Sequence, residues 1–297
     1  MHDRRSALRE LGRGAAGFAL LGSLGRVPRD AAAAEDTSPR LNVRVTEKGN
    51  SSLFQLRRAR GLVPVDACAA SVRGQIRGVL EDVSIYRKMP EILCETDPQT
   101  LEYFLSNPDI AVALWRSMGV SQMTLREVAG GVYDADGGDG SSGRVHLALA
   151  RQGERVIYCA GQFVNPVAKK PIKADCVVHF RNRYERASSG AVHSRHSATM
   201  FVRLASKAVE ATARVISPVS NRIADRNFEE VSLFIRMMSE AMRNRPGWCE
   251  QVGRGLAGVS PEKIDEFLTV AARVHASALR SKAASLRTAG ADASAVR

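Results

Sequence analysis

Residues 122–204 constrain the fold more than any other part of the chain, because they have the composition of strands almost throughout. They are rich in Val, Ile, Tyr and Thr and are interrupted by Gly-rich turns, a pattern typical of consecutive antiparallel strands. Residues 155–164 are apolar on both faces, as a strand at the centre of a covered sheet would be. We predict five strands, at about 122–133, 143–150, 154–164, 174–185 and 192–203.

The apolar pattern also predicts how the last two strands pair. A one-residue slip turns every side chain of a strand to the opposite face. The apolar residues of both strands therefore face one core only if the connecting loop has an odd number of residues. We predict a five-residue loop over 186–190, which pairs Phe180 with His196, Val178 with Ala198 and Cys176 with Met200.

Helical patterns flank this region on both sides. Before it, apolar residues recur at helical spacing over residues 72–83, and Asp97-Pro98 and Asn107-Pro108 begin two short helices. After it, residues 228–242 carry the strongest helical stripe in the chain. The prediction is an α+β fold with N-terminal helices, an antiparallel sheet of five to six strands (the sixth at 41–45) and a long C-terminal helix packed on the sheet.

This order of elements, across about residues 66–245, resembles the START-like (helix-grip) superfamily. The resemblance rests on element order and on no diagnostic motif, and the chain shows fewer clear strands than the family. It implies a cavity for a hydrophobic ligand between sheet and helix. A cystatin-like roll, as in periplasmic lipid carriers, has a similar order and is the alternative.

The N-terminus has the features of an export signal. Four arginines within residues 1–13 precede the uncharged run 14–25, and Ala31 to Ala34 offer small residues for cleavage near Glu35. Arg4-Arg5 is similar to a twin-arginine signal that lacks the usual aromatic residue. Ordinary secretion and a cytoplasmic protein with an amphipathic N-terminal helix are the alternatives.

We therefore predict an exported protein, periplasmic or secreted. Its parts are a signal peptide at 1–34, a polar extension at 35–65, one domain at 66–278 and a disordered basic tail at 279–297.

Composition narrows the classes of function. The net charge is +12, of which the leader carries three, so the mature chain should be drawn to anionic membrane surfaces or other acidic partners. Improved solubility is an equally simple reading of this charge. The mature chain has no apolar run long enough to span a membrane. The five cysteines form no C-x-x-C pair.

No motif indicates a cofactor, a metal or specific nucleic-acid binding. There is neither a Gly-rich phosphate loop nor a G-x-S-x-G elbow. His193 and His196 point to opposite faces of a strand, so they cannot share a metal ion.

Two groups of residues are candidate sites. The methionine-rich helix suits an adaptable ligand cavity, although an ordinary core would also explain it. The predicted lining consists of Tyr158, Phe180, Met200, Phe234 and Met238.

The second candidate is a basic face. The predicted pairing puts Arg181 opposite Arg195 and Arg183 opposite His193, and like charges across a sheet repel. A bound anion would relieve the repulsion, and splayed, solvated arginines are the alternative. The predicted anion site comprises Lys169, Lys170, Lys173, Arg181, Arg183 and Arg195.

These observations favour a non-enzymatic binding protein for an apolar or anionic amphiphilic ligand such as a lipid. The alternatives are an envelope protein that recognises an acidic partner through the basic face, and an enzyme of unknown class whose site is assembled from distant residues.

Overall fold

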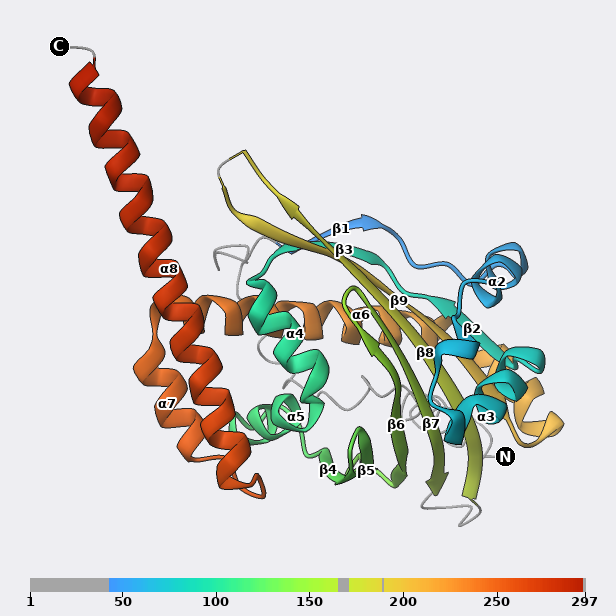
Figure 1. The fold of residues 1–297 in the computed structure, drawn as a ribbon. Helices are drawn as coiled ribbons and strands as arrows, with labels where there is room; N and C mark the ends of the chain where they lie inside the picture. The colour runs from blue at the N-terminus through green and yellow to red at the C-terminus, as the bar shows by residue number, and fades with distance from the viewer. Residues whose placement is uncertain (1–42, 165–170, 189, 296–297) are drawn as a thin grey trace, which may run out of the picture.

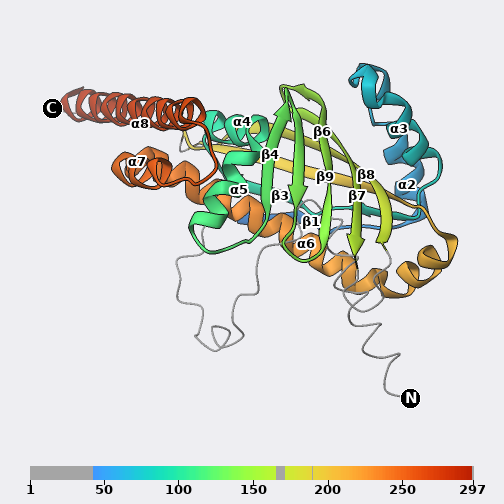
Figure 2. The ribbon, with the colours of Figure 1, turned by 90° about the horizontal axis from the view of Figure 1, so that it is seen from below.

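The computed structural model describes residues 43–164, 171–188 and 190–295, with side chains described outside 207–220 and 284–295. One large antiparallel sheet forms the centre of the protein, and helices cover both of its faces (Figures 1 and 2). The fold is α+β, as the sequence predicts. None of the described helices is long and apolar enough to span a membrane.

The sheet has nine strands where the sequence predicts five to six. Their order is β1-β3-β9-β8-β7-β6-β5-β4, and β2 also pairs with β9. The strands are β1 (Val43–Glu47), β2 (Ile85–Lys88), β3 (Glu91–Glu95), β4 (Thr124–Ala129), β5 (Val132–Asp136), β6 (Ser141–Arg151), β7 (Glu154–Val164), β8 (Pro171–Arg186) and β9 (Val192–Leu204).

The additional strands have simple physical origins. The predicted strand 122–133 is a hairpin, since Gly131 takes a positive φ of 71° between β4 and β5, a conformation that glycine adopts without strain. The short strands β2 and β3 both pair with β9 around Pro90. Stretches of four or five residues are too short to show a convincing alternation.

The pairing of β8 with β9 differs from the prediction by two residues. Phe180 pairs with Ala198, Val178 with Met200 and Cys176 with Val202. The loop does contain five residues, but it spans 187–191 rather than 186–190. Because the shift is even, the predicted side chains still share one face of the sheet.

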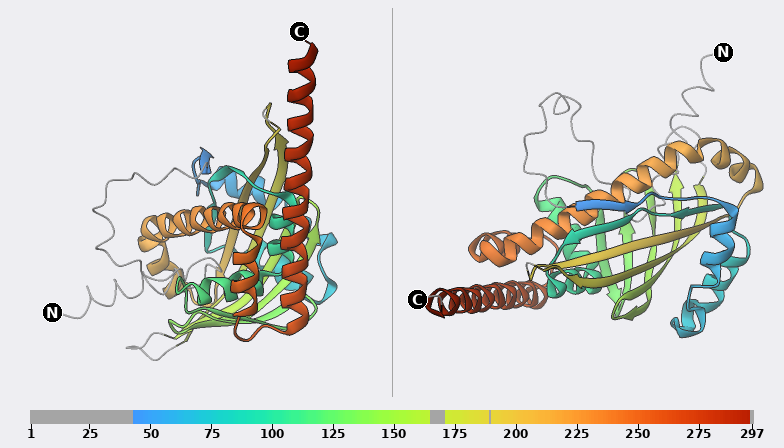
Figure 3. Two further views of the ribbon diagram at one scale, coloured as in Figure 1. Left: turned by 90° about the vertical axis from the view of Figure 1, so that its left-hand side faces the viewer. Right: turned by 90° about the horizontal axis from the view of Figure 1, so that it is seen from above.

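Helix α6 (Lys207–Asn244) crosses one face of the sheet, and α3 (Ala70–Glu81) lies on the opposite face (Figures 1 and 3). Each face has its own buried core. Phe228 of α6 packs with Cys176, Phe180 and Met200, whereas Ile76 of α3 packs with Tyr158, Val177 and Phe201.

A group of helices extends the α6 face beyond the sheet. It contains α4 (Pro98–Ser106), α5 (Pro108–Ser117), α7 (Pro246–Arg254) and α8 (Pro261–Ala295), all packed around the C-terminal half of α6. Phe104, Trp115, Phe234 and Phe267 form its aromatic centre, with ring centroids 5.4–6.4 Å apart.

Three segments extend beyond their predicted bounds. Helix α6 begins at Lys207, well before the predicted stripe at 228–242, and is continuous through Pro218 and Asn227. Residues 43–47 form β1, which pairs with β3 and overlaps the sixth strand predicted at 41–45. Helix α8 continues to Ala295 through most of the predicted disordered tail, and its C-terminal part projects from the body (Figures 1 and 3).

All five cysteines are free and buried. Cys159 and Cys176 lie directly opposite each other on β7 and β8. Burial raises the pKa of each of the five thiols, so the cysteines serve as small apolar residues of the core.

Candidate functional site

The candidate site is an apolar cavity between the sheet, α6 and the short helices α4 and α5. Its sheet wall is a row of side chains in register on four strands. Leu147 pairs with Ile157, Ile157 with Val178, and Val178 with Met200. Since opposite residues on antiparallel strands share a face, the row presents a continuous apolar surface to α6.

Helix α6 forms the facing wall. Phe228, Val231 and Ile235 recur at three- and four-residue spacing and line the cavity together with Ser232 and Phe234. This spacing places side chains on one helical face, so the predicted stripe at 228–242 does point toward the sheet.

The short helices α4 and α5 close the cavity. Helix α4 begins at Pro98, and the Asp97 side chain caps it by accepting hydrogen bonds from the backbone N–H groups of Gln99 (2.9 Å) and Thr100 (3.3 Å). Phe104 of α4 and Trp115 of α5 line the cavity and contact Phe234 edge-to-face. The Asp97 cap therefore helps to hold α4, and with it Phe104, over the site.

The cavity volume is about 190 Å³. For scale, an engineered apolar cavity of about 150 Å³ stays dry and binds benzene. Most lining residues are buried, but Leu147, Ile157 and Val178 are half-buried and adjacent.

The cavity wall carries no charge: none of the lining residues that the structure describes is Asp, Glu, Lys or Arg. Its polar groups are few. The buried hydroxyl of Ser232 donates to the Phe228 carbonyl oxygen (2.8 Å) and lies 2.8 Å from His196 Nε2. Because its only proton is committed, Ser232 accepts a hydrogen bond from the imidazole N–H.

His196 is held as a neutral ring. Its Nδ1 lies 3.1 Å from the hydroxyl of Ser194, which donates to it when Nε2 carries the proton. Phe180 and Phe228 flank the ring, with centroids 5.8 and 5.7 Å away. Burial lowers the pKa of His196 to about 4, because the interior disfavours the charged imidazolium.

Two of the lining residues carry hydrogen-bonding groups with capacity to spare. The Ser232 oxygen accepts one hydrogen bond and has a second lone pair. The indole N–H of Trp115 is buried and has no hydrogen-bond partner among the described residues. A buried donor without a partner is costly, so an oxygen atom of a ligand would stabilise this wall.

The Ser232–His196 pair has the wrong surroundings for a nucleophile and its base. A general base works best with a pKa near the operating pH, whereas the pKa of His196 is lowered to about 4. The second ring nitrogen faces a serine hydroxyl instead of a carboxylate. The arrangement suits recognition of a ligand better than acyl transfer.

The structure brings together three of the five predicted lining residues. Phe180, Met200 and Phe234 line the cavity. Met238 is buried in the neighbouring helical core. Tyr158 faces the opposite side of the sheet, where its hydroxyl donates to Asp175 (2.9 Å). The prediction for Tyr158 is wrong because residues 157 and 158 alternate between faces, and only Ile157 points to α6.

Two of the four described residues of the predicted anion site, Arg183 and Arg195, are paired with carboxylates. Arg195 pairs with Glu185 (2.6 Å) and Glu91 (3.0 Å), and Arg183 pairs with Glu185 (3.1 Å). Arg183 does lie opposite Arg195, and Arg181 lies opposite Ser197. The repulsion that suggested an anion is therefore relieved by carboxylates of the chain itself. Lys169 and Lys170 lie outside the described residues.

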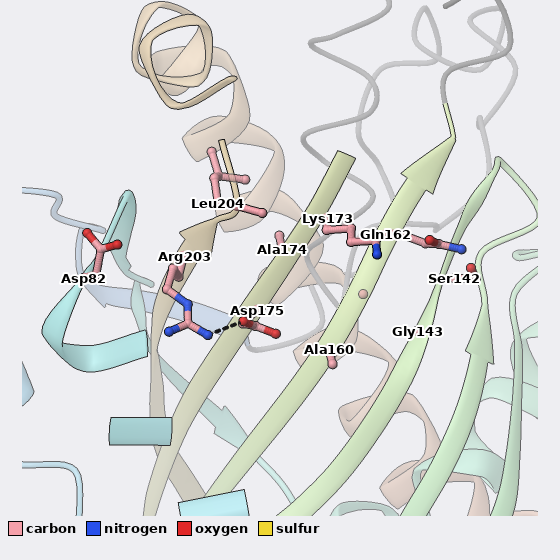
Figure 4. Close-up of a pocket in the computed structure, with 12 residues that line it drawn as sticks. Asp82, Ser142, Gly143, Ala160, Gln162, Lys173, Ala174, Asp175, Arg203 and Leu204 are labelled. Atoms are coloured by element: carbon pink, nitrogen blue, oxygen red, sulfur yellow. Dashed lines mark hydrogen bonds and ion pairs between the residues drawn. The ribbon is translucent and has the colours of Figure 1, made fainter. Parts of the chain in front are cut away.

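Two open grooves also occur on the surface. One, of about 640 Å³, crosses the ends of β6–β9 and includes Lys173 and the Arg203–Asp175 ion pair (2.5 Å) (Figure 4). The other, of about 1110 Å³, lies beside α5 and β4, where Lys263 contacts Asp109 and Glu127 (2.6 Å to Glu127). In the first groove Arg203 and Asp175 neutralise each other, and in the second Lys263 is paired with two carboxylates, so these charges are already satisfied within the chain.

Sequence reasoning missed Trp115, Ser232 and His196 as site residues. Trp115 was visible as an apolar residue of a short helix, but nothing in the sequence placed that helix over the sheet. Ser232 sits inside the apolar stripe of α6, and this interruption was the one available signal.

Comparison with known protein families found no model that matches the chain, and comparison with curated proteins found no match. Among the described residues, no cluster of three or more His, Cys, Asp or Glu side chains is placed to hold a metal ion.

Proposed function

We propose that this protein binds a small, uncharged, mainly apolar molecule in the cavity between the sheet and α6. The observation that carries the proposal is the cavity itself: about 190 Å³ lined by apolar side chains from six strands and three helices. Ligand sites are typically apolar clefts with a few placed polar groups. The Trp115 N–H and the Ser232 oxygen are such groups.

The absence of charge on the described lining narrows the ligand class. An ionised carboxylate or phosphate inside the cavity would lose its hydration and gain no cation in return, which is costly. The anionic amphiphile expected from the sequence therefore fits only if its head group stays outside. An alcohol, ketone or ester of modest size fits best.

Native mass spectrometry of residues 35–297, produced through the export pathway of a bacterial host, tests the proposal. The expected result is a discrete added mass that denaturation releases as an uncharged apolar compound. A polypeptide that never carries such a mass, and whose melting temperature no neutral apolar compound raises, would overturn the proposal.

Export is part of the proposal. The leader predicted at 1–34, with its Arg4-Arg5 pair, lies outside the described residues. A carrier for apolar compounds is useful where these must cross an aqueous compartment between membranes. Processing near Glu35, read by N-terminal sequencing of the exported protein, would support this assignment.

A further inference from the structure

Helix α2 (Leu53–Arg60) exposes large apolar side chains that the fold does not use. Leu53 and Phe54 are each 72% exposed, and Leu62, just beyond the helix, is 45% exposed. On its other side, Leu56 and Ala59 pack against the core under α3. The helix is thus anchored by its inner face, which leaves two adjacent large apolar residues in water.

Arginines share this outward face. With 3.6 residues per turn, Leu53, Phe54, Arg57 and Arg58 fall within one half of the helix circumference, opposite Leu56 and Ala59. Arg57 and Arg58 are exposed, and no carboxylate among the described residues pairs with either of them.

The segment around the helix is also basic. Residues 43–63 contain five basic residues and one acidic residue, and α2 contains no acidic residue. This differs from the basic face expected on β8 and β9, where glutamates neutralise Arg183 and Arg195. Unpaired positive charge and exposed apolar surface therefore coincide on α2.

We propose that α2 docks the protein on the surface of an anionic phospholipid bilayer. Leu53 and Phe54 enter the boundary between head groups and acyl chains, and Arg57 and Arg58 contact the lipid phosphates. Interfacial helices combine these two features, and each basic residue near an anionic leaflet adds to binding. The proposal rests on α2 alone and is independent of the cavity.

Flotation of residues 35–297 with lipid vesicles tests the proposal. One vesicle type contains phosphatidylcholine alone, and the other also contains phosphatidylglycerol. We expect binding to the anionic vesicles only, weakened by added salt because exposed charges are screened. The double variants L53S/F54S and R57E/R58E should each weaken binding roughly tenfold or more.

Matched controls separate α2 from general effects of charge and hydrophobicity. L279S removes an apolar side chain that is 55% exposed on α8. R116E/R126E reverses two exposed arginines of α5 and β4, which changes the net charge as much as R57E/R58E does. Both controls should bind anionic vesicles like the parent chain, and circular dichroism should show that every variant is folded.

Three results would overturn the proposal. The parent chain could bind neither vesicle, it could bind both equally, or the α2 variants could bind as tightly as the controls. If L53S/F54S instead dissociates an oligomer and leaves vesicle binding unchanged, α2 covers a second copy of the chain and the membrane proposal fails. Retention of the added mass by L53S/F54S keeps this test distinct from that of the cavity.

Discussion

At the scale of single residues, His196 shows how burial beside the cavity determines the protonation state of a side chain. Phe180, Phe228 and the sheet bury the ring, and two serine hydroxyls hold it neutral. The sequence showed only a histidine in a strand. Its burial depends on α6 crossing that strand, which a pattern within the strand does not reveal.

The pKa of His196, lowered to about 4, predicts a pH dependence of stability. The unfolded chain takes up a proton on this ring below pH 6.5, whereas the folded chain does so only near pH 4. The free energy of unfolding should therefore fall as the pH drops from about 6.5 to 4, by up to about 3 kcal/mol from this group.

Urea unfolding at several pH values measures this effect. The variant H196F should lose stability less steeply between pH 6.5 and 4 than the parent chain. Identical slopes for H196F and the parent chain would contradict the buried, neutral assignment.

Substitution of Ala111 and of Ala271 by leucine tests whether the cavity is empty space. Both are buried, but only Ala111 lines the cavity. Leucine at position 111 would extend into the void and should raise the free energy of unfolding by about 0.5–2 kcal/mol. Leucine at position 271 meets the packed helical core and should lower it by about 1–3 kcal/mol.

Denaturant unfolding of A111L and A271L provides the measurement, and A111L should also lose the bound mass. Destabilisation of equal size in both variants would mean that the site near Ala111 is already filled.

At the scale of elements, the sequence was most informative where one element supplies its own pattern. The strand predicted at 154–164 and the helix predicted to begin at Asp97-Pro98 both match the structure. The sequence was least informative where the conformation or register of an element is set by another element that packs against it. The two-residue error in the β8–β9 register left the faces correct, because only the parity of the loop is encoded in the alternation.

We expect helix α4 to act as the lid of the cavity. Substitution of its N-cap residue, Asp97, tests this role. D97A removes the acceptor for two backbone N–H groups and should lower the free energy of unfolding by about 1 kcal/mol. It should also speed release of the bound compound, because a loosened α4 opens the site. D97S, which keeps a capping oxygen, should restore most of both properties.

Denaturant unfolding measures the free energy of unfolding, and a chase with unlabelled ligand measures the rate at which the bound compound is released. A D97A variant that is less stable but releases ligand at the parent rate would show that α4 does not gate the cavity.

At the scale of the whole molecule, the protein has two separate candidate binding features, the apolar cavity and the exposed helix α2. The cavity combines residues from position 89 to position 235, and α2 lies outside it with exposed apolar and basic side chains. Composition alone predicted attraction to anionic surfaces. It could not say which arginines were free, because that depends on glutamates brought close by folding.

The most direct test of the central claim compares a neutral and a charged ligand of the same length. Trp115 lines the cavity and Trp248 of α7 does not, so W248F leaves Trp115 as the single tryptophan reporter. Titration of this variant should give a saturable change in Trp115 fluorescence with a higher affinity for octanol than for octanoate, because the cavity wall offers hydrogen bonds but no cation. Saturable binding of octanoate with equal or higher affinity, or no response to either compound, would contradict the account.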